Sequence, residues 1–109
     1  MEISILILLR NISKESHMPK LTFTFSYEKR AEKFIKKHPE LLSQYGKTLE
    51  LLEINPSHPS LRLHKLQGKL SDLYSVSINI SYRISLEFTL FKDEIILINV
   101  GSHNEIYRQ

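Results

Sequence analysis

The alternation of apolar and polar side chains between residues 74 and 88 constrains the fold of this chain more than any other feature. Apolar residues occupy every second position over 74–80 and again over 82–88. A period of two is typical of strands with one buried face, so these ranges predict an antiparallel hairpin with a turn near Asn79–Ser81. Ile95–Val100 is nearly all apolar, which predicts a central strand covered on both faces over part of its length.

The residues before this hairpin predict one more strand and two helices. Leu21–Ser26 alternates and indicates a half-buried strand with Phe25 pointing inward, after which Ser26 is expected to cap a helix. Basic residues line the outer face of that helix, and it is expected to end at His38, because the residue before a proline avoids the helical region. A second helix is expected over residues 40–54. Its inner face is expected to consist of Leu42, Tyr45, Leu49 and Leu52.

The predicted order is strand, helix, helix and three strands, which indicates an α+β fold with a small, mainly antiparallel four-stranded sheet. The two helices are expected to form a hairpin on one sheet face. The strand serines, Arg83 and Glu87 are expected to share the other face, open to a ligand. Leu61–Leu70 predicts a short irregular strand or a turn, and Lys92-Asp93 predicts a further turn.

Composition limits the classes of function. The chain has 109 residues, enough for one domain, and no cysteine, which excludes disulfides and thiolate metal sites. Its five histidines lack the spacing of metal ligands, so we expect neither a metal nor a cofactor. Residues 54–83 carry four basic side chains against one acidic, whereas residues 84–109 carry two basic against four acidic. A local basic face attracts polyanions, although a solvated surface explains these charges equally well.

The first 17 residues are treated as an extension, and the predicted domain covers residues 18–109. The apolar run Ile3–Leu9 is too short to span a bilayer, and it lacks the basic start and cleavage site of a signal peptide. Three interpretations remain open. Met18 is the true start, Ser16-His17-Met18 is a non-native remnant of an expression sequence, or the segment adds an edge strand or a short helix that docks on a partner.

Two residues, one within a predicted strand and one just after another, carry groups for phosphate and proton chemistry. Arg83 lies mid-strand, where its planar guanidinium suits phosphate oxygens, and the alternative is a salt bridge to Glu87 or Glu105. His103 follows Gly101, a glycine expected to allow a sharp turn and the close approach of a ligand. His103 is therefore a candidate general acid or base, and the alternative is a surface or capping histidine.

The remaining candidates lie in a basic loop and at the C-terminus. His64 is flanked by Lys65 and Lys69, which, together with Arg62, are expected to steer phosphates. The phenol of Tyr107 is a candidate to orient a phosphate or stack on a base, and the alternative is an anchor for the C-terminus. No phosphate-binding glycine loop, nucleophile elbow or pair of carboxylates on adjacent elements competes with this set.

Together these motifs resemble the RelE/ParE superfamily of bacterial toxin–antitoxin systems, and most of all its YafQ-type ribonuclease branch. The resemblance covers residues 21–109. It is carried by the helical hairpin, Leu66-Gln67-Gly68, Tyr82-Arg83 and the ending from Gly101 to Tyr107. It implies a toxin that cuts mRNA on the 70S ribosome in the cytoplasm without a metal, and a cognate antitoxin protein in a hetero-oligomer. We expect attack by the ribose 2′-hydroxyl to leave a 2′,3′-cyclic phosphate.

The resemblance also implies residue roles. His64 falls on a catalytic or substrate-orienting histidine, Arg83 on the phosphate-binding arginine, His103 on the proton-transferring position and Tyr107 on the aromatic residue after it. The chain departs from the pattern on the strand before Arg83, where Ser75 and Ser77 replace basic residues. It departs again at Asn79–Ser81, where further acid/base residues of the branch are missing.

Two alternatives stay open. A ParE-type toxin, which acts on gyrase by binding, has the same fold, although such members generally lack the His64, Arg83, His103 and Tyr107 set. The other alternative is a noncatalytic module that only binds an antitoxin or RNA, which the two serines would suit.

Overall fold

The computed structural model describes residues 19–89 and 93–107, and its centre is a five-stranded sheet of order β1-β5-β4-β3-β2. β1 pairs with β5 in parallel, and the other neighbours are antiparallel. The prediction of four strands is wrong by one, because the expected irregular segment contributes β2 at the sheet edge. The strands are β1 (Lys20–Phe23), β2 (His64–Lys65), β3 (Tyr74–Ser77), β4 (Tyr82–Thr89) and β5 (Glu94–Ser102).

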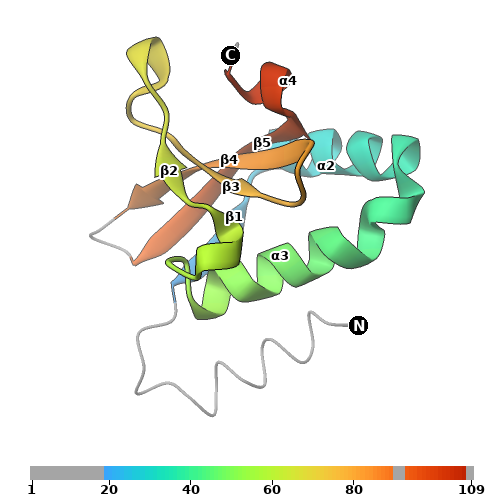
Figure 1. Ribbon diagram of the computed structural model, residues 1–109, viewed down its shortest axis with the longest axis horizontal. Coiled ribbons are helices and arrows are strands. Elements are labelled where there is room, and N and C mark those ends of the chain that lie inside the picture. Colours follow the sequence, from blue (N-terminus) through green and yellow to red (C-terminus); the bar gives the residue numbers. More distant parts are fainter. Residues whose placement is uncertain (1–18, 90–92, 108–109) are drawn as a thin grey trace.

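Helices cover both sides of this sheet in the described part of the chain. Figure 1 shows α2 and α3 as a hairpin on one side, while the short α4 lies on the other side, near the C-terminus. The α+β class and the helical hairpin are therefore confirmed. The α-helices are α2 (Phe25–Lys37), α3 (Leu42–Ile54) and α4 (His103–Tyr107), and the 3-10 turns are η1 (Pro39–Leu41), η2 (Pro59–Leu61) and η3 (Gly68–Leu70).

The first helix begins earlier than the sequence predicted. Thr24 is its cap, and its hydroxyl accepts a hydrogen bond of 3.2 Å from the Tyr27 amide. Phe25 consequently belongs to the first turn of α2 and is 74% exposed, instead of pointing inward from a strand. The predicted cap at Ser26 is wrong because a threonine two residues earlier already supplies the side-chain oxygen that a helix start needs.

The end of α2 and the start of α3 follow from one proline. The His38 amide closes α2 on the Phe34 carbonyl at 2.9 Å, and Pro39 then opens η1, as expected for a proline in a first helical turn. The tighter η1 turn changes the phase of the apolar face, so Leu41 is buried and Leu42 is 56% exposed. The predicted core position of Leu42 is therefore wrong, whereas Tyr45 and Leu52 of α3 are buried as predicted.

The main core lies between the helical hairpin and the sheet. Two phenols within it are satisfied by each other, since the Tyr27 and Tyr45 hydroxyls lie 2.7 Å apart. Burial raises the pKa of both tyrosines. The strand members of this core are Leu21, Val76, Ile84, Leu86, Ile95, Leu97 and Val100, and Ile78, directly after β3, joins them.

A β-bulge in β5 determines which residues follow it on each face. Ser85 pairs with Asn99, but the next residue along β4 pairs with Leu97, so one residue of β5 is extra. An extra residue reverses the alternation beyond it. Val100 therefore joins the core, and Gly101 becomes the cross-strand partner of Arg83.

The sheet face opposite the helical hairpin is not open, contrary to prediction. Ser75 and Ser85 are fully buried, and Arg83 is only 8% exposed. Two fully buried apolar residues outside the main core, Leu66 and Ile106, come from the segments that carry β2 and α4. Leu66 and Ile106 therefore cover part of the sheet face that was expected to be open.

The predicted hairpin turn at Asn79–Ser81 is confirmed, although it begins one residue earlier than expected. β3 ends at Ser77, and the Asn79 side chain then accepts hydrogen bonds from the amides of Ser81 and Tyr82 at 2.8 and 2.9 Å. Ile80, which continued the apolar alternation, consequently lies in the turn and is 96% exposed. The apolar pattern overestimated the strand because asparagine bonds to the backbone two residues on and so favours a turn.

The expectations for residues 1–17, and for Lys92 in the predicted turn, concern positions outside the described residues. Within residues 19–89 and 93–107, no helix combines the length and apolar character needed to cross a membrane.

Candidate functional site

The neighbouring strand β3 binds the Arg83 guanidinium through Ser75. Its Nε donates to the Ser75 hydroxyl at 2.8 Å, and its Nη2 lies 3.3 Å from the Ser75 carbonyl. Burial is the main cause of a lowered pKa for Arg83, opposed by the nearby Tyr107 and reinforced by the charge of Arg62. The guanidinium is nevertheless always protonated in proteins. The sheet therefore fixes a positive, planar group beneath the surface.

Arg62 acts on this site through its backbone. It follows η2 in the left-handed conformation, with φ 48° and ψ 48°. This geometry turns its carbonyl toward Arg83, whose Nη2 donates to it at 2.9 Å, and toward Nδ1 of His64 at 3.1 Å. The Arg62 side chain is exposed. The predicted phosphate-steering role belongs to this side chain, whereas the contacts with Arg83 and His64 belong to the backbone carbonyl.

His64 connects the guanidinium to the C-terminal helix. It lies in β2, and its Nδ1 is 3.3 Å from Nη2 of Arg83. Its Nε2 forms a short hydrogen bond with the Tyr107 hydroxyl. One tautomer satisfies both ring nitrogens, with Nδ1–H donating to the Arg62 carbonyl and Nε2 accepting from the phenol.

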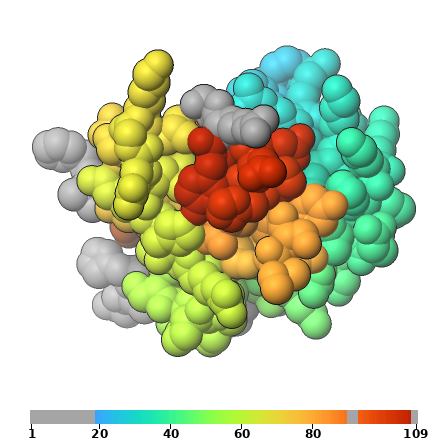
Figure 2. All heavy atoms as spheres, turned by 45° about the horizontal axis from the view of Figure 1, so that its top comes forward, coloured from blue at the N-terminus to red at the C-terminus, as the bar shows by residue number. Residues whose placement is uncertain are grey.

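Tyr107 lies between two imidazoles. Its ring is stacked on that of His64, with centroids 6.0 Å apart at 13°, and it contacts His103 at 4.2 Å between centroids. The His103 amide donates to the Ser81 carbonyl at 3.2 Å, which ties the start of α4 to the β3–β4 turn. Figure 2 shows α4 in red on the surface, between the yellow segment around β2 and the orange β3–β4 turn.

The four predicted residues thus form a continuous series of contacts, Arg83 to His64 to Tyr107 to His103. Exposure differs among these residues, because Arg83 is buried and Tyr107 is half-buried, whereas His64 and His103 are exposed. An anion approaching from solvent would meet the imidazoles and the phenol first and the guanidinium beneath them. This order suits a phosphate held by Arg83 and proton transfers carried out by the outer groups.

The predicted steering lysines lie at the border of this surface. Lys65 follows His64 in β2, and Lys69 lies in η3, after Gly68 in a left-handed conformation with φ 68°. Both side chains are exposed. Their position suits long-range attraction of a polyanion better than proton transfer.

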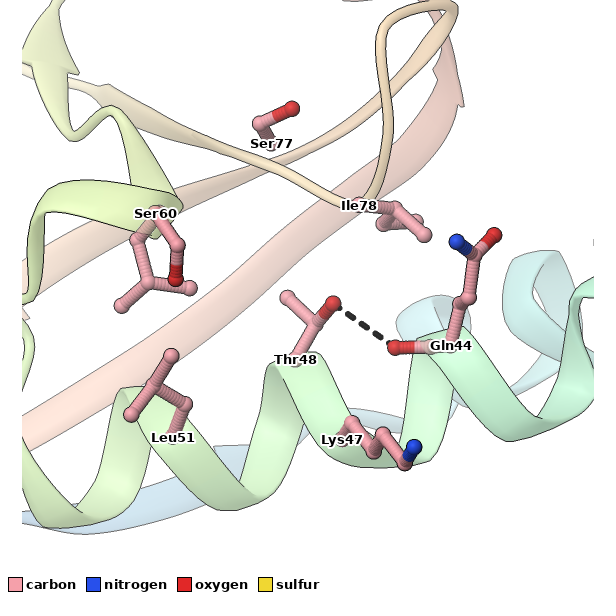
Figure 3. A pocket seen from close by; sticks show the side chains of 8 residues that line it. Gln44, Lys47, Thr48, Leu51, Ser60, Ser77 and Ile78 are labelled. Carbon is pink, nitrogen blue, oxygen red and sulfur yellow. Dashed lines mark hydrogen bonds between the residues drawn. The ribbon is translucent and has the colours of Figure 1, made fainter.

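A shallow cavity elsewhere on the molecule does not carry comparable groups. It has a volume of about 300 Å³ and lies between α3 and β3, where Figure 3 shows Thr48 donating to the Gln44 carbonyl at 2.8 Å. None of the four contacting residues lines it. Its lining holds no histidine, carboxylate or arginine, and Lys47 is its one charged group. Within the described residues there is also no group of three potential metal ligands.

Three groups that hold the site residues in place were not predicted from the sequence. Ser75 was classed as an exposed departure from a family pattern, although it is buried beneath Arg83. The Arg62 carbonyl left no signal, because left-handed arginine has no sequence signature. A signal did exist for the third, since Ser102 and Glu105 have the spacing of a capping box and indeed bond to each other.

These contacts lie on the fold of the RelE/YafQ-type toxins of toxin–antitoxin systems, and the predicted resemblance is confirmed at that level. YafQ from E. coli superimposes with a TM-score of 0.67 at 13% identity, over 82% of this chain and 98% of YafQ. HP0894 from Helicobacter pylori gives a TM-score of 0.64 at 27% identity, over 82% of this chain and 99% of that protein. A chain of the E. coli DinJ–YafQ toxin–antitoxin complex gives a TM-score of 0.66 at 15% identity, over 83% of this chain and 98% of that chain. No protein-family model and no curated protein matches the sequence.

Proposed function

We propose that this chain is the toxin of a type II toxin–antitoxin system and a metal-independent endoribonuclease that cleaves mRNA on the ribosome. The observation that carries the proposal is the contact series from Arg83 through His64 and Tyr107 to His103. The fold supports the toxin class, and the DinJ–YafQ neighbour supports an antitoxin as the protein partner. Ribosome-bound mRNA as the substrate places the activity in the cytoplasm.

The chemistry follows from the order of the groups. The 2′-hydroxyl of the ribose attacks the adjacent phosphorus while its proton passes to the Tyr107 oxygen, and the phenol proton passes to Nε2 of His64. Arg83 stabilises the charge that develops on the phosphate oxygens. His103 donates a proton to the 5′-oxygen as the P–O5′ bond breaks, and the products are a 2′,3′-cyclic phosphate and a free 5′-hydroxyl.

One positioned acid or base contributes about 10²–10⁴-fold to a rate. His64 and His103 lie exposed on the surface, where few side chains are available to orient a flexible RNA strand. Orientation of reacting groups is a large part of catalysis, so we assign that part to the ribosome, which presents the mRNA in a fixed geometry. Free RNA should accordingly be a poor substrate.

The test compares two histidines with the same substitution. His103→Asn should lower single-turnover cleavage of ribosome-bound mRNA by about 10²-fold or more. His58→Asn is the matched control, because His58 is exposed outside the site and caps η2 by accepting from the Ser60 amide, a role asparagine can take over. The control should cleave at the wild-type rate, and the products should carry cyclic phosphate ends.

Arg83→Lys provides the second arm. It keeps a positive charge but loses the planar fork, so we expect a large loss of cleavage. Full activity in both His103→Asn and Arg83→Lys would contradict the proposal. Growth arrest that persists in both variants, with inhibition of DNA supercoiling by purified gyrase, would support the ParE-type alternative instead.

A further inference from the structure

The junction between β5 and α4 contains a pair of reciprocal hydrogen bonds. The Ser102 amide donates to Oε1 of Glu105 at 2.7 Å, and the Glu105 amide donates to the Ser102 hydroxyl at 3.2 Å. Serine at the cap and glutamate three residues later form a capping box, which satisfies two amides that a helix start leaves unpaired. The pair therefore defines where α4 begins and how it leaves the sheet.

α4 needs such support because it is very short. It has five residues, and an isolated helix of that length is not stable in water. Apart from the capping box, its described attachments are the fully buried Ile106, the bond from the His103 amide to Ser81 and the hydrogen bond between Tyr107 and His64. The same five residues carry both His103 and Tyr107, so the direction of α4 determines where an imidazole and a phenol lie.

Gly101 is shaped for the Glu105 side chain. A Cβ atom at position 101 would lie 2.7 Å from Oε1 of Glu105 and 3.3 Å from its Cβ and Cδ. Gly101 is not among the residues with positive φ, so its backbone conformation does not require glycine. From the sequence, Gly101 was expected to allow a sharp turn and the close approach of a ligand. The structure instead shows a strand residue, paired with Arg83, whose missing side chain makes room for a carboxylate.

We propose that Glu105, seated over Gly101, is a positioning residue that holds α4 in the direction that brings His103 and Tyr107 to Arg83 and His64. The proposal rests on the proposed function, because it gives Glu105 no contact with RNA and makes it act through α4. The basic side chains Arg30, Lys33 and Lys37 of α2, and His38 directly after this helix, line the same groove as Glu105.

The charged state of Glu105 agrees with this role. Hydrogen bonds from Ser102 are the main cause of a lowered pKa for Glu105, and Lys37 and His38 lower it further. The carboxylate is therefore ionised at neutral pH. An ionised acceptor forms stronger hydrogen bonds to amides than a neutral one.

The experiment is a double-mutant cycle on Gly101 and Glu105. Gly101→Ala and Glu105→Ala should each lower the single-turnover cleavage rate at saturating ribosome-bound mRNA by roughly tenfold, as expected for the loss of a helix cap. The double variant should be no slower than Glu105→Ala, because the carboxylate that the new methyl group would meet is gone. Glu105→Gln keeps an acceptor oxygen and should retain most of the rate. Affinity for the ribosome complex should stay unchanged in all four variants.

A second readout does not depend on catalysis. Amide hydrogen exchange of Glu105 and Ile106, and the ring resonances of Tyr107, should change in Glu105→Ala and remain close to wild type in Glu105→Gln. Glu105 is exposed, so this variant should fold even if Gly101→Ala does not. Unchanged exchange and resonances in Glu105→Ala, or additive effects in the cycle, would overturn the proposal. Normal cleavage by both His103→Asn and Arg83→Lys would instead overturn the proposed function, and these α4 measurements would still decide the role of Glu105.

Discussion

Replacing Ser75 by alanine should loosen Arg83 without touching any surface group. The change removes the hydroxyl that accepts from Nε at 2.8 Å, while the Ser75 carbonyl and the Arg62 carbonyl still bind Nη2. A hydrogen bond to a charged group contributes about 1.5–3 kcal/mol, and Arg83 is too buried for water to replace it fully. We therefore expect the free energy of unfolding to fall by about 1.5–3 kcal/mol.

Thermal unfolding followed by circular dichroism measures this loss. One kcal/mol lowers the Tm of a domain of this size by about 4–8 °C, so Ser75→Ala should melt at least ~6 °C below wild type. Cleavage of ribosome-bound mRNA should fall as well, because a misplaced phosphate-binding group costs up to about 10²-fold.

Ser77→Ala is the matched control for this experiment. Ser77 lies on the same strand, directly opposite Arg83, but its hydroxyl donates to the Asn79 carbonyl at 2.6 Å and not to the guanidinium. Its loss should cost only about 0.5–1.5 kcal/mol, the usual value for a neutral hydrogen bond, and should leave cleavage unchanged. Equal losses of stability and activity in the two variants would refute the idea that Ser75 holds Arg83 in place.

Three further predictions test the fold around the site. Thr24→Ala should lower the free energy of unfolding in urea by about 1 kcal/mol and Ser26→Ala by much less, and the reverse order would contradict the assignment of the cap. Arg62→Gly should leave stability within about 1 kcal/mol of wild type, whereas Arg62→Val should lower it by about 1–2 kcal/mol in the same assay, because a left-handed backbone suits glycine and strains valine. Tyr27 and Tyr45 have raised pKa values in the folded protein, so the unfolded chain ionises first, and stability should fall as pH rises above about 10. Tyr27→Phe should reduce that alkaline loss in urea titrations, and an unchanged pH dependence would show that the buried pair is not its cause.

The class of fold could be predicted because it rests on long, repeated patterns. The alternation over residues 74–88 and the break at His38 both describe how the chain buries apolar area, which the sequence displays directly. The errors occurred where a single local hydrogen bond outweighed the pattern. Thr24 started α2 before the apparent strand was complete, and Asn79 turned the chain before Ile80 could enter the sheet.

The candidate site could be predicted in its side chains but not in its supports. Histidine, arginine and tyrosine attract notice through their chemistry, and their order along the chain suggested one surface. The bulge in β5 had no comparable signal, although it determines that Gly101 pairs with Arg83. The burial of the sheet face that carries Ser75 and Arg83 could not be predicted either, because it depends on how the segments around β2 and α4 pack in three dimensions.

Ser75 bears on whether this chain is a catalyst or a binding module. The family resemblance predicted basic residues on the strand before Arg83, and Ser75 and Ser77 in their place were one reason to consider a noncatalytic protein. In this structure Ser75 is fully buried under Arg83, and a lysine there would place a second cation beside a guanidinium with no carboxylate among its contacts in the described part of the chain. Two buried like charges destabilise each other strongly. A serine at position 75 therefore suits a buried, hydrogen-bonded arginine, and its presence is compatible with the proposed phosphate-binding role of Arg83.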